Sequence, residues 1–171
     1  MRMRKSQGYT LTEAMLVIAI LGTVLGLGGT LMIQAQRYIR LNLARTEIQR
    51  ESRATLSNIN RELRQALAST VVIDQVTGQP PQSRITFQHY KTDGSLQTVS
   101  YYQQGSKLYM KLGSSGTGKI MGLPLRFLAF TYPQTDNDGI VSVSLTYESA
   151  TYQGQTKALQ MAVEKVRIMN P

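Results

Sequence analysis

The sequence predicts an α+β fold, in which one long N-terminal α-helix packs on an antiparallel β-sheet head. Three patterns predict it. An uncharged apolar run extends from Ala14 to Ile33, a polar stretch with helical periodicity continues to about Ala68, and patterns of period two begin after Ser69. The 171 residues suffice for one globular domain and one long element.

The composition limits the chemistry that the chain can carry. It contains no cysteine, which excludes disulfides, thiolate metal sites and lipidated cysteines. The formal net charge is +9, and Arg2, Arg4 and Lys5, which precede the apolar run, contribute +3 of it. Next to a membrane segment, such a basic cluster indicates the cytoplasmic side of the bilayer. The net charge alone therefore does not indicate nucleic-acid binding.

The apolar run is long enough to cross a bilayer, because about 20 residues at 1.5 Å each span the roughly 30 Å hydrocarbon layer. Glu13 lies immediately before this run. An ionisable residue at such a boundary costs free energy, so Glu13 is a functional candidate that needs a positively charged partner.

The run has three interpretations. A secretory signal peptide has an apolar centre of about 7–15 residues and an A-x-A-like cleavage site, whereas this run is longer and no such site closes it. A plain transmembrane anchor explains the length and the basic flank but not Glu13. In the third interpretation, a cut after Gly8 gives Tyr9 a new α-ammonium, which pairs with Glu13 of a neighbouring copy or homologous subunit. Burial strengthens such a pair and makes an unpaired member costly, so it would drive assembly in register.

The order of basic residues, Gly8, an aromatic Tyr9, Thr10-Leu11-Thr12-Glu13 and a continuous apolar run resembles the class III leader of type IV prepilins and type II secretion pseudopilins. The resemblance covers about residues 5–33. It implies cleavage between Gly8 and Tyr9 by the prepilin peptidase, N-methylation of Tyr9, and a role for Glu13 as the assembly glutamate. It also implies a pilin-like fold with a leader at 1–8, a transmembrane and assembly helix at 9–33, its amphipathic continuation at 34–68 and a β-rich head at 69–171.

Two features depart from the family pattern. Tyr9 replaces the commoner phenylalanine, and the later part of the apolar helix lacks the proline that is often found there. Several glycines stand in this part instead, and either they supply local flexibility, since glycine destabilises a helix by about 1 kcal/mol relative to alanine, or they allow close helix packing in the membrane. They are Gly22, Gly26, Gly28 and Gly29.

The polar stretch is predicted to continue the helix, because no glycine or proline interrupts it and apolar residues recur at steps of three and four. The apolar face contains Leu56, Ile59, Leu63 and Leu67, and a second, basic face contains Arg50, Arg53, Ser57, Arg61 and Arg64. The whole helix would have about 55–60 residues and a length of about 80–90 Å. The basic face is open to three interpretations: a solvated surface, a contact with acidic surfaces of neighbouring subunits, or nucleic-acid binding, which the absence of interleaved aromatic residues disfavours.

The head is predicted from segments rich in β-formers, separated by turn signals such as Thr92-Asp93-Gly94. Short turns favour antiparallel pairing, and alternation favours one packed face that covers the apolar stripe of the helix. The predicted strands are 70–76, 84–89, 97–102, 107–112, 125–132, 140–147 and 159–168. Their spacing and aromatic residues resemble those of J-class minor pseudopilins and W-class minor pilins.

The head offers few candidates for other chemistry. Asp136 and Asp138 are weak calcium candidates, because the EF-hand spacing is absent and Asp-Gly is a common hairpin turn. His89 is the single histidine, which excludes a His-based metal cluster or triad within one chain. Glu148 and Glu164 are interpreted as surface charges without a partner. No nucleophile, base and oxyanion donor assemble, so the chain is predicted not to be an enzyme and to need no cofactor.

The predicted function is that of a minor structural subunit of a type IV pilus or a type II secretion pseudopilus. Its partners would be the prepilin peptidase, other pilins or pseudopilins through the N-terminal helix, the lipid bilayer and, as the family implies, an inner-membrane platform and a motor ATPase. It would cross the bacterial cytoplasmic membrane once, with the head outside the cytoplasm, before entering a fibre. The alternative is a membrane-tethered, DNA-binding minor pilin of a DNA-uptake pilus, although nucleic acid is not an expected partner.

Overall fold

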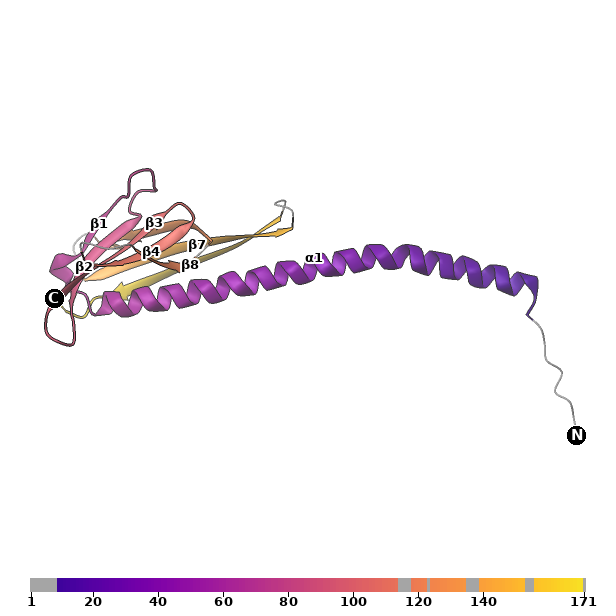
Figure 1. Ribbon diagram of the computed structural model, residues 1–171, viewed down its shortest axis with the longest axis horizontal. Coiled ribbons are helices and arrows are strands. Elements are labelled where there is room, and N and C mark those ends of the chain that lie inside the picture. Colours follow the sequence, from indigo (N-terminus) through magenta and orange to yellow (C-terminus); the bar gives the residue numbers. More distant parts are fainter. Residues whose placement is uncertain (1–8, 114–117, 123, 135–138, 153–155, 171) are drawn as a thin grey trace, which may run out of the picture. The chain divides into compact units, whose positions relative to one another are not determined.

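The computed structural model describes residues 9–113, 118–122, 124–134, 139–152 and 156–170. Figure 1 shows one helix followed by a region of strands. The elements are α1 (Leu11–Arg64), the short 3-10 helix η1 (Ala68–Thr70), β1 (Val72–Asp74), β2 (Arg84–Tyr90), β3 (Leu96–Gln104), β4 (Lys107–Leu112), β5 (Lys119–Gly122), β6 (Leu125–Thr131), β7 (Ile140–Tyr152) and β8 (Thr156–Arg167). One long helix and antiparallel sheets confirm the predicted α+β class.

The chain divides into two compact units, and the boundary falls within α1 between Arg40 and Leu41. The first unit contains the N-terminal part of α1, and the second contains the rest of α1 and all the strands. The predicted boundaries at 8/9, 33/34 and 68/69 describe chemical segments rather than compact units, and they remain predictions.

Helix α1 is continuous through its glycines and has 54 residues, close to the predicted length. It ends at Arg64, four residues before the predicted end at Ala68. The reason is competition from the sheet: Ala66 forms a β-bridge with His89, and the Leu67 N–H donates to the Gln88 carbonyl at 2.9 Å. The Leu67 N–H is therefore satisfied by tertiary pairing instead of by another helical turn.

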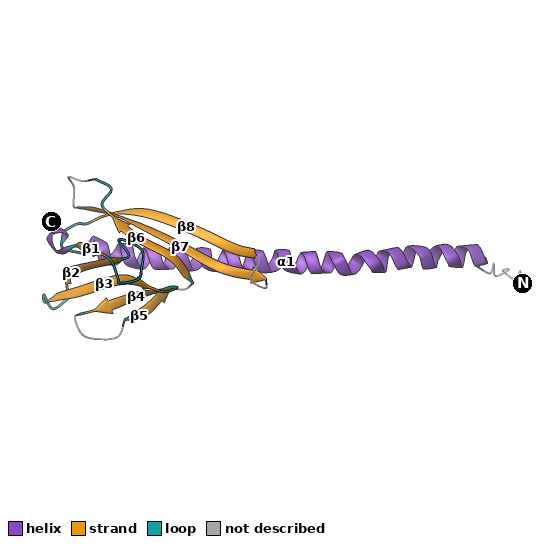
Figure 2. Cartoon of the chain, turned by 90° about the horizontal axis from the view of Figure 1, so that it is seen from above, coloured by secondary structure: helices purple, strands orange, loops and turns teal. Residues whose placement is uncertain are grey.

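The strands form two antiparallel sheets rather than one (Figure 2). The five-stranded sheet has the order β1-β2-β3-β4-β5, and the three-stranded sheet has the order β6-β7-β8. Each predicted strand corresponds to an observed one, and β4 has the predicted bounds. Strand β5 was not predicted. Its four residues are too few for a clear alternation, and they pair with β4 through a register shift between Leu108 and Tyr109.

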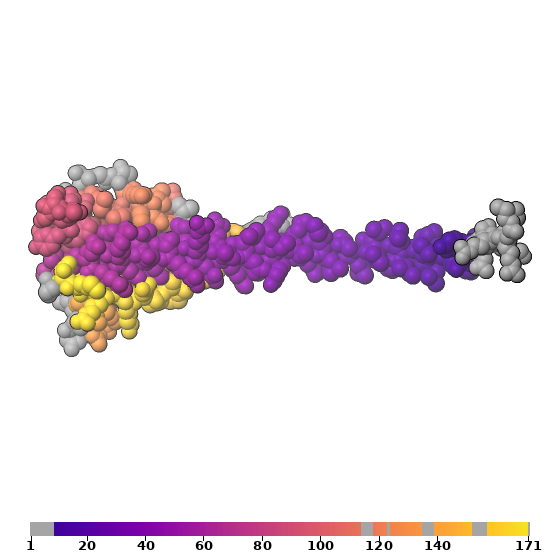
Figure 3. Space-filling view, turned by 90° about the horizontal axis from the view of Figure 1, so that it is seen from below, coloured from indigo at the N-terminus to yellow at the C-terminus, as the bar shows by residue number. Residues whose placement is uncertain are grey.

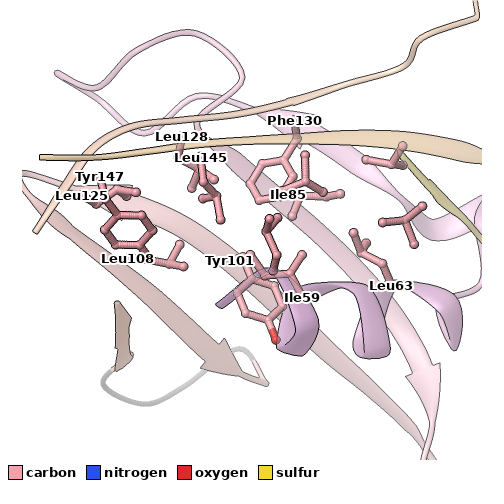
Figure 4. Packing of buried hydrophobic residues seen from close by; sticks show 14 of the residues in the cluster. Ile59, Leu63, Ile85, Tyr101, Leu108, Leu125, Leu128, Phe130, Leu145 and Tyr147 are labelled. Carbon is pink, nitrogen blue, oxygen red and sulfur yellow. The ribbon is translucent and has the colours of Figure 1, made fainter. Parts of the chain in front are cut away.

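The core lies between the C-terminal part of α1 and the two sheets (Figure 4). Ile59 and Leu63 of α1 are fully buried, as the helical periodicity predicted. They pack in one cluster with side chains from both sheets, among them Ile85, Tyr101 and Phe130. Burial of such large apolar side chains supplies about 1.5–3 kcal/mol each, so this cluster fixes the head on its own segment of the helix.

Gly122 of β5 lies where a larger residue would not fit. A Cβ at this position would collide with the Tyr147 hydroxyl, which is buried and donates a 2.9 Å hydrogen bond to Thr55 of α1. The glycine therefore allows the sheet to approach a buried polar link between β7 and the helix.

Candidate functional site

The N-terminal site begins at Tyr9, the first described residue. Its side chain is 88% exposed, and α1 begins two residues later at Leu11. Arg2, Arg4, Lys5 and Gly8 lie outside the described residues. The predicted cleavage, the methylation of Tyr9 and the basic leader therefore remain predictions.

Thr10 and Glu13 form a reciprocal cap at the start of α1. The Thr10 N–H donates to Glu13 Oε2 at 3.1 Å, and the Glu13 N–H donates to the Thr10 hydroxyl at 3.4 Å. The Thr10 hydroxyl also donates to Oε2, at 3.1 Å. This is the capping-box arrangement, which satisfies backbone donors that a helix N-terminus otherwise leaves unpaired. The carboxylate also lies near the positive end of the helix dipole.

The cap gives Glu13 a structural role that the sequence interpretation missed. The signal was present, because Thr10-x-x-Glu13 before an apolar run is the sequence signature of a capping box. Both bonds to the carboxylate use Oε2, and no donor among the described residues reaches Oε1. One carboxylate oxygen thus remains available to a group from outside the chain.

The apolar run that follows packs against nothing else in the described part of the chain. Its large side chains are more than half exposed around the whole helix, for example Val17 at 53% and Leu25 at 70%. Among the described residues, α1 is the one helix that is long and apolar enough to cross a membrane. Exposed apolar surface of this extent indicates an environment of lipid or other protein.

The glycines of the run add no bulk to the helix surface. A Cβ placed on Gly22, Gly26, Gly28 or Gly29 would meet no atom of the described residues within 4 Å. The fold of the single chain thus does not require glycine at these positions, and the uninterrupted helix gives no sign of a break there.

The basic face of α1 is exposed, as the helical pattern predicted. Arg61 forms an ion pair with Glu62 at 3.4 Å. Arg50, Arg53 and Arg64 form no ion pair with another described residue. Their charges are therefore available to a ligand or to solvent.

The structure corrects the interpretation of Glu148 as an unpartnered charge. Arg126 Nη1 lies 2.6 Å from Glu148 Oε2, and Lys157 Nζ contacts Oε1. Hydrogen bonds from Lys157 and then Arg126 lower the pKa of Glu148 below its ordinary value of 4.5. Glu164 is exposed and has no ion pair with a described residue.

His89 lies in β2 with its side chain 12% exposed, and its Nδ1 is 3.5 Å from Glu62 Oε2. This contact was not predicted. Asp136 and Asp138, the weak calcium candidates, lie outside the described residues. Within the described part of the chain, no three His, Asp or Glu side chains gather as a metal-binding group.

Comparison with known proteins identifies the N-terminal segment. Residues 3–29 match a family model described as the prokaryotic N-terminal methylation motif. No curated protein and no solved structure matches the chain. The match confirms the resemblance to type IV prepilins at the level of this motif, and the minor-subunit subclass stays a prediction. Residues 3–29 thus carry a prepilin-like motif, and the helix that overlaps it is long and apolar enough to cross a membrane.

Proposed function

We propose that this chain is a minor structural subunit of a type IV pilus or a type II secretion pseudopilus. The prepilin peptidase would cut it between Gly8 and Tyr9, and the first unit of α1 would then assemble with other pilins or pseudopilins. The observation that carries the proposal is the run from Ala14 to Ile33. It is apolar on all sides and packs against no other described residue, and its first part overlaps the match to the methylation motif.

Assembly would transfer this run from lipid to a bundle of similar helices. Lipid tails are as apolar as leucine, so the transfer gains little from the hydrophobic effect and must depend on packing and polar pairing. Glycines with open space at the Cβ position, such as Gly22 and Gly26, allow neighbouring helices to approach closely. The packing and the flexibility interpretations of these glycines both remain predictions.

Glu13 would supply the polar pairing. Its Oε2 serves the cap within the chain, and its Oε1 is open to the α-ammonium of a cleaved neighbour. The two roles are compatible because they use different oxygens. A buried ammonium–carboxylate pair is costly to break, by about 3–5 kcal/mol when one partner is removed, so the pair would select the correct register among otherwise similar apolar contacts.

Mass spectrometry of the purified protein tests the processing. The expected N-terminus is Tyr9, with a methyl group on its amine. A strain without prepilin peptidase is the control, in which the N-terminus should be Met1. An N-terminus at Met1 in a strain with active peptidase would contradict the proposed function.

Deletion of the gene would separate the two kinds of fibre. Surface fibres and twitching are expected to be lost if the subunit belongs to a pilus, and protein secretion is expected to be lost if it belongs to a secretion pseudopilus. The platform and motor ATPase are implied partners in both cases. A deletion strain that keeps all these properties and DNA uptake would count against the proposal.

DNA binding is the alternative function, and the exposed arginines Arg50, Arg53 and Arg64 are the observation in its favour. Neutralised phosphates release counterions, so DNA affinity should fall steeply as salt rises. Binding of duplex DNA to the full chain in detergent, measured across a salt series, tests this. Binding that is absent, or that does not weaken with salt, rules the alternative out.

A further inference from the structure

A groove lies between the C-terminal part of α1 and strand β8. Figure 3 shows residues of β8, in yellow, alongside this part of the helix, in magenta. The groove has a volume of about 680 Å³, and its lining includes Arg53, Asn60 and Arg64 from α1 and Glu164 from β8. All these residues belong to the second unit. We refer to this feature as the α1–β8 groove.

The helix side of the groove is basic. Arg53 and Arg64 are exposed, and neither forms an ion pair with a described residue. A guanidinium presents paired N–H donors that match a carboxylate or a phosphate. The first requirement on a ligand is thus a group that accepts hydrogen bonds and carries negative charge.

The same groove also presents acceptors. Asn60 is only 8% exposed, and no donor among the described residues reaches its buried Oδ1. Glu164 adds an exposed carboxylate on the strand side. A phosphate dianion offers no N–H donor to Asn60. A peptide with acidic side chains brings both backbone N–H donors and carboxylates, so it fits the groove better.

The third feature of this region is the unpaired outer edge of strand β8. This strand is the last of the β6-β7-β8 sheet, and its outer edge pairs with no strand in the described part of the chain. An unpaired edge is a template for another strand. The edge also carries apolar residues that face away from the core, with Leu159 57%, Met161 67% and Val163 54% exposed.

The two faces of β8 differ in character. Ala158 and Val166 face the core side and are buried, and Glu164 on the same side lines the groove. Leu159, Met161 and Val163 alternate with them on the opposite side. A strand added next to β8 would also point successive side chains to opposite faces. One set would face the arginines, and the other would lie beside the apolar residues.

We propose that the outer edge of β8 binds an extended segment of a partner protein, in which acidic residues alternate with apolar ones. The acidic side chains reach Arg53 and Arg64 in the α1–β8 groove, and the apolar side chains cover Met161 and its neighbours. Main-chain hydrogen bonds to the edge supply affinity, and the alternating side chains supply specificity. The proposal does not depend on leader cleavage or on the function proposed above.

A labelled peptide tests the proposal on the full chain in detergent micelles. The probe is a capped peptide of about six residues, a common strand length, which alternates valine and glutamate. Fluorescence anisotropy is expected to show saturable binding. Arg53→Gln and Arg64→Gln should each weaken it by about tenfold, the effect of losing one charge-assisted contact. Arg50→Gln is the matched control, because it removes the same charge from α1 outside the groove lining, and it should leave the affinity unchanged.

Two control peptides separate the parts of the interaction. A peptide with lysine in place of glutamate should not bind, and one with alternate backbone nitrogens methylated should lose most of its affinity. Equal binding of either control, or an equal effect of Arg50→Gln, would overturn the proposal. Tighter binding of a single-stranded oligonucleotide with the same dependence on Arg53 and Arg64 would also overturn it and would assign the groove to nucleic acid.

Discussion

The two parts of α1 differ in what surrounds them, although they belong to one continuous helix. From Leu11 to Arg40 the side chains are exposed on every side, and Leu25 and Leu31 remain 70% and 64% exposed. From Leu41 to Arg64 apolar residues form a single stripe, and Ile59 and Leu63 are fully buried. A single apolar stripe indicates a helix that packs within its own chain. A helix that is apolar on all sides indicates one that packs against lipid or other proteins.

We expect this difference to separate residues that act in fibre assembly from residues that stabilise the head. Substitutions in the N-terminal part should alter incorporation into a fibre and leave unfolding of the head unchanged. Substitutions in the C-terminal part should alter the free energy of unfolding. The predictions below test this separation, from the largest expected effect to the smallest.

The largest effect is expected at Glu13. Glu13→Gln keeps an oxygen that can accept the Thr10 N–H bond of the cap but removes the charge. In the proposed pair with a neighbour's α-ammonium, loss of one member would cost about 3–5 kcal/mol, so incorporation should fall by at least about a hundredfold. The measurement is the amount of the subunit in sheared fibres relative to the membrane fraction.

Thr10→Val is the matched control for Glu13→Gln. It removes the capping hydroxyl but keeps the carboxylate, so it should lower incorporation far less. If Glu13→Gln assembles normally and Thr10→Val does not, Glu13 acts through the cap alone and the proposed pairing is wrong.

The next effect is expected in the core. Leu63→Ala should lower the free energy of unfolding of the head by about 2–5 kcal/mol, the usual result of a large-to-small change at a buried leucine. Leu25→Ala makes the same chemical change in the exposed part of the helix and should have little effect on the head. Denaturant unfolding, followed by near-UV circular dichroism of the full chain in detergent, measures both. Similar losses for the two variants would show that the parts of α1 are not energetically separate.

A smaller effect is expected at the link between β7 and α1. Tyr147→Phe removes the hydrogen bond to Thr55, so the buried Thr55 hydroxyl loses this donor. The free energy of unfolding should fall by about 1–3 kcal/mol. Tyr90→Phe, at a 57% exposed position, is the control and should be nearly neutral.

The stability that Tyr147 contributes should also depend on pH in the alkaline range. Burial raises the pKa of Tyr147 from 10.0 to about 12. The stability that this shift contributes is complete below pH 10 and is lost as the pH rises toward 12. The difference in stability between the native chain and Tyr147→Phe should therefore shrink over that interval. A constant difference would contradict the shift.

The smallest effect is expected at Glu148. Its folded-state pKa is lowered by Lys157 and Arg126, so the pairs contribute stability above the ordinary value of 4.5 and lose it as the pH falls through the folded value. Glu148→Gln should therefore reduce the melting temperature slightly at neutral pH and not at strongly acid pH. The expected reduction is small because the two cationic side chains are 57% and 53% exposed. A melting-temperature difference that persists in acid would point to packing instead of charge.

The sequence predicts the elements of this fold better than their ends and partners. Local periodicity suffices for α1 and for a strand such as β4. The end of α1 at Arg64 depends on pairing of Ala66 with His89, which no local pattern contains. Similarly, the contact between Arg126 and Glu148 depends on the bulged register of β6 against β7. Long-range register decides such contacts, so they were not predicted.

At the candidate site the sequence interpretation missed a local contact instead of a long-range one. Glu13 was identified from the energetic cost of a carboxylate beside an apolar run, and its partner was sought outside the chain. The cap with Thr10 is purely local and was overlooked, although its spacing is visible in the sequence. The basic face was predicted from helical spacing, whereas the groove beside β8 required the three-dimensional arrangement.

If the leader is removed as proposed, the cap has a consequence for the order of events. Its donors are the N–H and hydroxyl of Thr10, which lie on the C-terminal side of the Gly8–Tyr9 bond. Removal of the leader at that bond leaves both donors in place. The conformational entropy of the Glu13 side chain, up to about 2 kcal/mol for a long polar residue, is thus already reduced in the precursor. Proteolysis would then act as the timing step, since it creates the ammonium for a carboxylate that is already in position.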